Sequence, residues 1–170
     1  VAKIELDEEF KNRGMELWGN QIRFGISKIA KDSVYWFAVA LDRPHQKDNK
    51  EDRKSKLLKM FTNFHPLVNT LIRNTPEATI LRHDINDLRP LKKWYQSNIC
   101  LIGDAAHATT PNMGQGGAQA IEDAYYLGNL IAKKPKENSF NLFQEKRQRK
   151  VHKIVKQSWS IGEMAHWRYG

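Results

Sequence analysis

The sequence of 170 residues contains a single cysteine, Cys100, and no apolar run near the length of about 20 residues that a membrane-spanning helix needs. One cysteine cannot form a disulfide within the chain, and cysteine-based zinc sites need several thiolates. This composition suits the reducing cytoplasm, and we expect neither a membrane-spanning helix nor a membrane partner. Because Cys100 lies inside an apolar run, a buried core thiol is its simplest interpretation.

Acidic residues are scarce relative to basic ones. Lys and Arg number 28 against 19 Asp and Glu, which gives a net charge of +9 and an isoelectric point near 9.7. Such a charge raises nucleic acid, acidic lipid or an anionic ligand as partners but selects none of them. Hydrophobic residues make up 40% of the chain and aromatic residues 10%, so a packed core is expected and a mainly disordered chain is excluded.

The first part of the chain has the pattern of an antiparallel sheet. Residues 15–18 and 22–26 alternate apolar with other residues, and residues 34–41 form a β-branched and aromatic run. A short polar turn, residues 30–33, has the length that joins hairpin strands. We therefore expect strands here, with the last two forming a hairpin.

Two helices and a short strand are expected next. Pro66 fits the first turn of a helix over residues 67–73, because proline is tolerated there but not in a helix interior. Residues 78–81 predict a short strand. The helix before Pro66 is predicted from apolar residues at helical spacing, which are Leu57, Phe61 and Phe64.

Residues 99–102 form an unbroken apolar run that ends at Gly103 and Asp104. This is the pattern of a strand buried on both faces, as in a parallel sheet between helices. A loop, a glycine-rich segment and then a helix follow. We expect the apolar face of that helix to consist of Ala118, Ile121, Ala124, Tyr125, Leu127 and Leu130 or Ile131.

Residues 133–156 carry nine Lys or Arg and two acidic residues, which predicts an amphipathic helix with a basic outer face. Because residues 145–157 contain no aromatic residue, a solvated face explains this charge better than nucleic-acid binding does. A basic module that binds nucleic acid or an acidic partner through residues 133–156 remains the alternative function. The apolar side is expected to hold Phe140, Phe143, Val151, Ile154 and Ser158, and the basic side Lys146, Arg149, Lys150, Lys153 and Lys156.

Gly103 and Asp104 are the first candidate site residues. Ligands of open α/β sheets lie at the carboxyl ends of strands, where a glycine allows close approach and an aspartate accepts hydrogen bonds from sugar hydroxyls. The structural alternative is that Asp104 caps the turn that follows it.

The glycine-rich segment from Gly114 to Gly117 directly precedes a helix. Glycines there leave N–H groups open to a ligand, and the helix start favours negative charge. The segment is not a Rossmann fingerprint, because Gln119 occupies the position of the third glycine. A flexible entry to the helix is the alternative.

His107 has no partner at metal-ligand spacing, and the chain contains no G-x-S-x-G segment. We therefore expect neither a metal site nor serine-hydrolase chemistry.

Residues 99–131 read ICLIGDAAHATTPNMGQGGAQAIEDAYYLGNLI. This order closely resembles the second FAD-binding segment of the class A flavoprotein monooxygenases, the para-hydroxybenzoate hydroxylase-like enzymes that include salicylate and urate hydroxylases and zeaxanthin epoxidases. The resemblance implies FAD as cofactor, NAD(P)H as transient reductant, and oxygen. It also implies a small aromatic substrate that is hydroxylated or epoxidised.

The same resemblance assigns roles to residues of the site. Asp104 would bind the ribityl chain of FAD, Gly103 would allow close approach, and Pro111 would lie beside the flavin ring. Arg23 and Tyr35, on the predicted hairpin, would face the substrate. The edge of the isoalloxazine ring would be lined by the main chain of Gly114, Gln115, Gly116, Gly117 and Ala118.

The expected fold is α/β: a partial Rossmann-like FAD/NAD(P)-binding domain, part of an antiparallel substrate-domain sheet, and C-terminal helices. We assign residues 1–90 to the partial substrate domain, 91–134 to the second FAD-binding segment and 135–170 to a C-terminal helical segment. No G-x-G-x-x-G segment is present to hold the FAD pyrophosphate. We therefore expect the missing N-terminal FAD-binding part of the same enzyme as a partner, an inactive chain on its own, and self-association through uncovered apolar surface.

Overall fold

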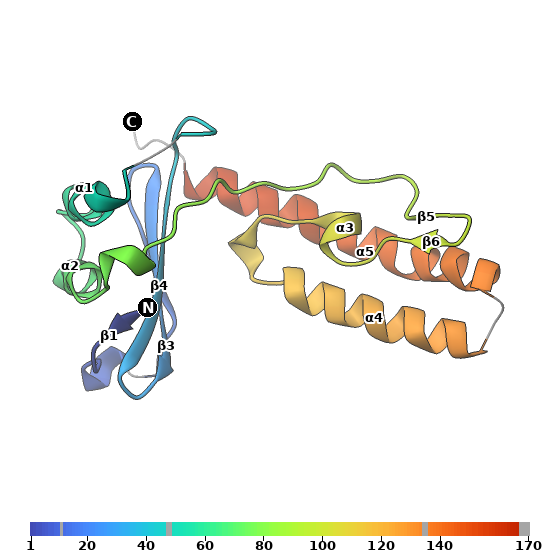
Figure 1. The fold of residues 1–170 in the computed structure, drawn as a ribbon, viewed down its shortest axis with the longest axis horizontal. Helices are drawn as coiled ribbons and strands as arrows, with labels where there is room; N and C mark the ends of the chain where they lie inside the picture. Colours follow the sequence, from blue (N-terminus) through green and yellow to red (C-terminus); the bar gives the residue numbers. More distant parts are fainter. Residues whose placement is uncertain (11, 47–48, 134–135, 167–170) are drawn as a thin grey trace. The chain divides into compact units, whose positions relative to one another are not determined.

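A computed structural model describes residues 1–10, 12–46, 49–133 and 136–166 (Figure 1). The chain forms two compact units, the first built on Val1–Asp84 and the second on Ile85–Met164. Residues 134–135 of the predicted basic stretch and residues 167–170 of the predicted C-terminal segment lie outside the described residues.

The first unit contains a four-stranded antiparallel sheet in the order β1-β4-β3-β2. The predicted hairpin is confirmed, and its strands pair from Ile22 opposite Ala40 to Ala30 opposite Ser33, with one irregularity near Lys28. The strands are β1 (Ala2–Lys3), β2 (Met15–Trp18), β3 (Ile22–Ala30) and β4 (Ser33–Ala40).

Helices α1 (Arg53–Met60) and α2 (Pro66–Arg73) belong to the same unit, with 3-10 turns at Glu8–Phe10, Lys50–Asp52 and Glu77–Thr79. The predicted helix start at Pro66 is confirmed. The strand predicted for residues 78–81 is wrong. The N–H groups of Thr79 and Ile80 donate to the nearby carbonyls of Pro76 and Glu77, so the segment closes on itself instead of pairing with a strand.

The sheet has two different faces, because side chains alternate along a strand. Phe24, Ile26 and Val34 point to one face and pack with α2 residues such as Val68 and Leu71 in a buried core. The opposite face carries, on neighbouring strands, Trp18, Arg23, Gly25, Tyr35 and Phe37. The core face packs against the helices of the unit, whereas the residues of the opposite face do not belong to this core.

The second unit is built on two long helices that lie side by side and antiparallel (Figure 1). Its core contains Trp94, Ala106, Phe143, Val151 and Val155. Of the helices in the described residues, none has the length and apolar content to cross a membrane. The elements are β5 (Tyr95–Gln96), β6 (Ile99–Cys100), α3 (Asp104–His107), a 3-10 turn at Pro111–Met113, α4 (Gly116–Lys133) and α5 (Lys136–Ala165).

Two expectations for this unit hold only in part. The apolar run at residues 99–102 is not buried on both faces: β6 is two residues long, pairs antiparallel with β5, and leaves Ile99 68% exposed. On α4 the predicted apolar face is only partly covered: Leu127 and Leu130 pack against the core of the unit, whereas Ile121 is 73% and Tyr125 68% exposed. The side of α4 that faces α5 is instead partly polar, because Asp123 bonds to a buried arginine there.

The close packing of Gly25 against Phe37 generates a stability prediction. A Cβ at position 25 would lie 2.1 Å from Cε1 of the Phe37 ring, so a side chain there must displace the ring. We expect Gly25→Val to lower the free energy of unfolding by about 1–3 kcal/mol in thermal or denaturant unfolding. Ser27→Val, at an exposed position on the same face of β3, is the control and should have little effect. Equal stability of the two variants would contradict this packing.

Candidate flavin site

The turn at Gly103 and Asp104 is set by its glycine. Gly103 has a φ of 56° and a ψ of −141°, a conformation that residues with side chains rarely adopt. A Cβ there would also lie 3.1 Å from Cβ of Ala120 on α4. Position 103 therefore requires glycine for two independent reasons, and the turn lies directly against α4.

Asp104, the first residue of α3, presents an open carboxylate. Its backbone carbonyl accepts the N–H of Ala108, whereas its side chain is exposed. Within the part of the chain that the structure describes, no group donates to this carboxylate. The side chain is thus free to accept hydrogen bonds from a ligand.

The turn around Pro111 is fixed to α5. Thr110 Oγ1 lies 2.8 Å from Ser158 Oγ, and the Asn112 amide donates to the backbone carbonyl of Ser158 at 2.8 Å. Pro111 itself is exposed, and Gly114, which closes the turn, has a left-handed φ of 63°. The hydrogen bonds hold the backbone while the proline ring stays accessible.

The start of α4 carries open backbone donors. The N–H groups of the first helical turn have no acceptor within a helix, and no described side chain accepts from those of Gly116, Gly117 or Ala118. Gly117 and Ala118 are exposed, and a Cβ on Gly117 would meet no atom within 4 Å. This surface can receive a flat group bearing negative charge.

These features fit FAD. The exposed Asp104 carboxylate suits the hydroxyls of a ribityl chain, and the uncovered helix start suits the electron-rich edge of an isoalloxazine ring. Gln115, between the two glycine positions, is half-buried, and its carbonyl accepts the N–H of Gln119. The structure thus brings the FAD residues predicted from the sequence onto two neighbouring turns of one unit.

A buried ionic network lies behind the turn. Asp123 Oδ2 accepts the Gly103 N–H at 2.9 Å and a bond from His107 Nε2 at 2.6 Å, while Oδ1 accepts the Arg147 Nε–H at 2.7 Å. Asp123, His107 and Arg147 are 0%, 3% and 1% exposed. Burial alone would raise the pKa of Asp123, but the hydrogen bonds from His107, Arg147 and Gly103 outweigh it and hold the pKa below its usual value.

Arg147 also fixes the beginning of α4. Its Nη2 donates to the Gln119 carbonyl at 3.2 Å and to Gln119 Oε1 at 2.8 Å. Its Nη1 donates to Glu122, whose carboxylate also accepts from Lys150 at 2.7 Å. These bonds, with that of Lys150 foremost, hold the pKa of Glu122 below its usual value.

Sequence reasoning missed Asp123, Arg147 and Gln119. The sequence did contain a sign that Arg147 is buried, because it lies four residues from both Phe143 and Val151 on the apolar side of the predicted helix. Gln119 and Asp123 are likewise four residues apart and lie on one side of α4. Charged residues of opposite sign in the interior positions of two helices predict a buried ion pair between them.

His107 belongs to this network through its bond to Asp123. The centroid of its ring lies 5.2 Å from that of the buried Trp94, whose centroid lies 5.9 Å from that of His152.

Burial, with smaller contributions from His107 and Lys156, lowers the pKa of His152. Burial and the nearby Asp123 charge raise the pKa of the half-buried Cys100 thiol, so it stays protonated near neutrality.

Arg23 and Tyr35 lie on the face of the sheet opposite the core of the first unit. Tyr35 is 46% exposed and lies 6.3 Å, between ring centroids, from Phe37. Arg23 is not the surface charge that an exposed strand would give: it is buried, and its Nη1 donates to Glu16 at 2.9 Å. The ion pair occupies one arm of the guanidinium group.

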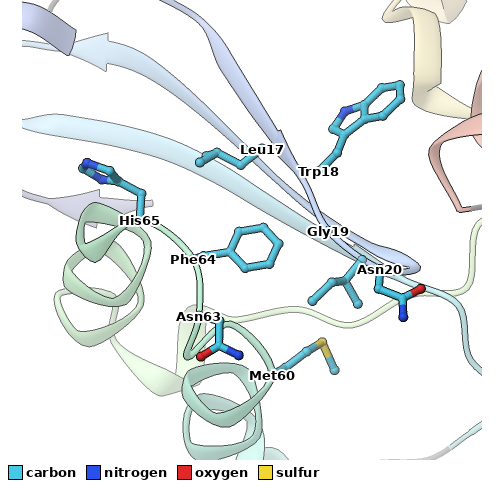
Figure 2. A pocket seen from close by; sticks show the side chains of 9 residues that line it. Leu17, Trp18, Gly19, Asn20, Met60, Asn63, Phe64 and His65 are labelled. Atoms are coloured by element: carbon cyan, nitrogen blue, oxygen red, sulfur yellow. The ribbon is translucent and has the colours of Figure 1, made fainter. Parts of the chain in front are cut away.

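A cavity of about 460 Å³ lies elsewhere in the first unit, between the β2–β3 turn and the connection of α1 to α2 (Figure 2). His65 at its rim already caps α2, because its Nδ1 accepts the N–H of Leu67. Neither Arg23 nor Tyr35 lines this cavity. It is lined by Leu17, Trp18, Gly19, Asn20, Ile22, Met60, Asn63, Phe64 and His65.

The amphipathic character predicted for α5 is confirmed within the described residues. Phe140, Phe143, Val151, Ile154 and Ser158 are buried. Two of the basic residues have local partners, since Lys150 bonds to Glu122 and Lys146 lies 5.6 Å from the Tyr126 ring centroid. The exposed basic side chains are Lys146, Arg149, Lys150, Lys153 and Lys156.

Residues 15–158 match the family model described as "FAD binding domain". The chain belongs to this family. The match spans strands β2 to β4, the Gly103 turn and most of α5, and it confirms the predicted α/β fold class and the FAD cofactor.

The relatives of this FAD-binding family member include oxidoreductases. It is 38% identical over 153 residues to the aurachin C monooxygenase/isomerase of Stigmatella aurantiaca, and 36% identical over 156 residues to the 2-heptyl-3-hydroxy-4(1H)-quinolone synthase of Pseudomonas aeruginosa. Each alignment covers 89% of this chain and 40% of the relative. The chain thus spans about 40% of the length of these curated relatives, and the predicted resemblance to the flavoprotein monooxygenases is confirmed.

A solved structure supports the same conclusion. Klebsiella pneumoniae HpxO, complexed with FAD and uric acid, superposes with a TM-score of 0.87 at 25% sequence identity. The superposition covers 96% of this family member and 43% of HpxO.

The lowered pKa of Asp123 predicts an acid-sensitive fold. A carboxyl whose pKa is lower in the folded state stabilises the protein above the unfolded pKa of about 4, and this stability is lost as the pH falls through the folded value. We expect Asp123→Asn to cost about 3–5 kcal/mol near pH 7, because Arg147 loses its buried counter-charge. In unfolding curves measured from pH 7 to 2, the difference from the wild type should shrink at the acid end. Asp87→Asn, at an exposed position, is the control, and a pH-independent difference for Asp123→Asn would contradict the ion pair.

The exposed apolar residues of α4 predict self-association of the isolated chain. Ile121 and Tyr125 lie one turn apart on its outer side, and uncovered apolar surface of this kind drives association. We expect light scattering to show oligomers of the chain and a shift towards monomer in the double variant Ile121→Lys, Tyr125→Lys. Gln157→Lys adds a positive charge at an exposed position of α5 without removing apolar surface and should change nothing. A monodisperse wild-type monomer would refute the prediction.

Proposed function

We propose that this chain forms the flavin-ring part of an FAD-dependent monooxygenase that hydroxylates or epoxidises a small aromatic substrate, with oxygen as co-substrate and NAD(P)H as transient reductant. The observation that carries the proposal is the pairing of the Gly103–Asp104 turn with the open start of α4. The first supplies a free carboxylate beside a close-approach glycine, and the second supplies unpaired N–H groups.

Each residue of the site has a defined task in this proposal. The Asp104 carboxylate accepts hydrogen bonds from the ribityl hydroxyls, and Gly103 lets the cofactor approach the main chain. Pro111, held by its neighbours' bonds to Ser158, limits the position of the flavin ring. The main chain of Gly114, Gln115, Gly116, Gly117 and Ala118 lines the ring edge.

Bound FAD supplies the electron-transfer and oxygen chemistry, so the protein needs no acid–base pair of its own for that step. The start of α4 contributes electrostatics, since its N–H groups and helix dipole stabilise negative charge on the ring. Ala118 has no polar side-chain atom, so position 118 contributes only its backbone.

The substrate class follows from the relatives and from the sheet. The names of the relatives refer to aurachin C and to a heptyl-hydroxyquinolone, and HpxO was crystallised with uric acid. A small aromatic or heterocyclic substrate is therefore favoured. Tyr35 is the more accessible of the two substrate residues, because Arg23 is buried and already bonded to Glu16.

A further FAD-binding segment completes the cofactor site in this proposal. The chain spans about 40% of its relatives and contains no G-x-G-x-x-G segment for the pyrophosphate. The exposed apolar residues Ile99, Ile121 and Tyr125 provide a surface for such a segment. On its own, the chain would bind FAD weakly and be inactive.

The Asp104 carboxylate gives the direct test of this function. In the full-length protein we expect Asp104→Ala to weaken FAD binding about tenfold or more, because ribityl hydroxyls lose a charged acceptor. The melting temperature of the apo-protein should not change, since the side chain is exposed and unpaired. FAD affinity is measured by quenching of flavin fluorescence.

Asp87→Ala is the matched control, because Asp87 is an exposed aspartate of the same unit. It should leave FAD affinity unchanged. Full-length wild-type protein that binds no FAD, or Asp104→Ala protein that binds it as tightly as the wild type, would contradict the proposed site.

A further inference from the structure

Asp123 connects the Gly103–Asp104 turn of the proposed FAD site with three helices of the unit. Its carboxylate accepts the N–H of Gly103 in the turn, the ring N–H of His107 at the end of α3, and Nε–H of Arg147 on α5. Asp123 itself belongs to α4, the helix whose start faces the ligand. One side chain therefore joins the turn, α3, α4 and α5.

The backbone bond to Gly103 is the informative one. A buried ion pair is often no more stabilising than apolar residues of the same volume, so the presence of Asp123 and Arg147 does not follow from stability alone. The N–H of Gly103 immediately precedes Asp104, the residue whose carboxylate is open to solvent. The buried Asp123 carboxylate thus fixes the backbone of Gly103, and through it the position of the Asp104 carboxylate.

Arg147 fixes the start of α4, the other part of the proposed site, in a similar way. Its guanidinium group donates both to Asp123 and to the backbone carbonyl and side chain of Gln119. Gln119 directly follows Ala118, the last of the residues assigned to the ring edge. The contact between Gly103 and Ala120, where a Cβ would lie only 3.1 Å away, leaves the two halves little freedom to shift independently.

We propose that Asp123 is a positioning residue for FAD, and that Arg147 and His107 fix it so that the Gly103–Asp104 turn and the start of α4 keep one relative geometry. The inference rests on the proposed function, since it concerns the same site. Asp123 does not touch the cofactor, because its side chain is fully buried. It acts through the backbone of Gly103 and through Gln119.

The test compares Asp123→Ala and Asp123→Asn with Phe143→Ala in the full-length protein. Phe143 is a buried core residue of the same unit and makes none of the hydrogen bonds of this network, so its truncation lowers stability without altering the turn directly. FAD is titrated into each apo-protein well below its melting temperature. Amide exchange of Gly103 is measured in the absence of FAD.

We expect Asp123→Ala to raise the FAD dissociation constant at least about tenfold and to speed exchange of the Gly103 amide. Asp123→Asn should lie between Asp123→Ala and the wild type, since its amide oxygen can still accept the Gly103 N–H. If Asp123→Ala does not fold, the comparison is made with Asp123→Asn alone. Phe143→Ala should bind FAD within twofold of the wild type and keep the Gly103 amide protected.

Two results overturn the inference in distinguishable ways. If the wild type binds FAD and the Asp123 variants bind it no more weakly than Phe143→Ala does, Asp123 is only a structural residue and the proposed function stands. If the wild type binds no FAD, the proposed function fails and the inference fails with it.

Discussion

The ion pair between Asp123 and Arg147 is the constraint on which the second unit depends. It lies between the two long helices, both partners are almost fully buried, and they also bond to the Gly103 N–H and to Gln119, next to the proposed flavin site. Buried charges are costly unless each has a partner. Here the partners are supplied by the turn and by the helix start, so satisfying the charges and shaping the site are the same requirement.

The sequence allowed the local elements to be predicted where pattern and context agreed. The hairpin of β3 and β4 and the buried side of α5 follow from side-chain periodicity, because both elements find their partners within the same unit. The strand at residues 99–102 and the apolar face of α4 were predicted as buried and are covered only in part, since Leu101 and Leu127 pack against the core. Their apolar character is real, but burial depends on what covers a surface, and Ile99, Ile121 and Tyr125 are left uncovered by the described residues.

The residues proposed to contact FAD were selected from the sequence, whereas the buried residues behind them were not. Glycine at positions 103 and 114 and an aspartate after a strand are visible in the sequence because ligand approach restricts the residue type locally. Asp123 and Arg147 are separated by 24 residues, and their pairing depends on how two helices dock. The alternative that Asp104 caps the turn could not be judged from the sequence, because it depends on whether the carboxylate meets a donor, and in the structure the side chain is exposed.

The supports of the site come late in the chain, and this has a consequence for synthesis. The turn at Thr110 and Asn112 is held by Ser158, 46 to 48 residues further on, and the Gly103 turn is held through an aspartate whose counter-charge is Arg147. Contacts of such separation close slowly and only after the distant segment is available. As the polypeptide leaves the ribosome, the glycine-rich segment therefore emerges without its fixed shape. The flavin-ring part of the site takes its final form only once α5 has been made.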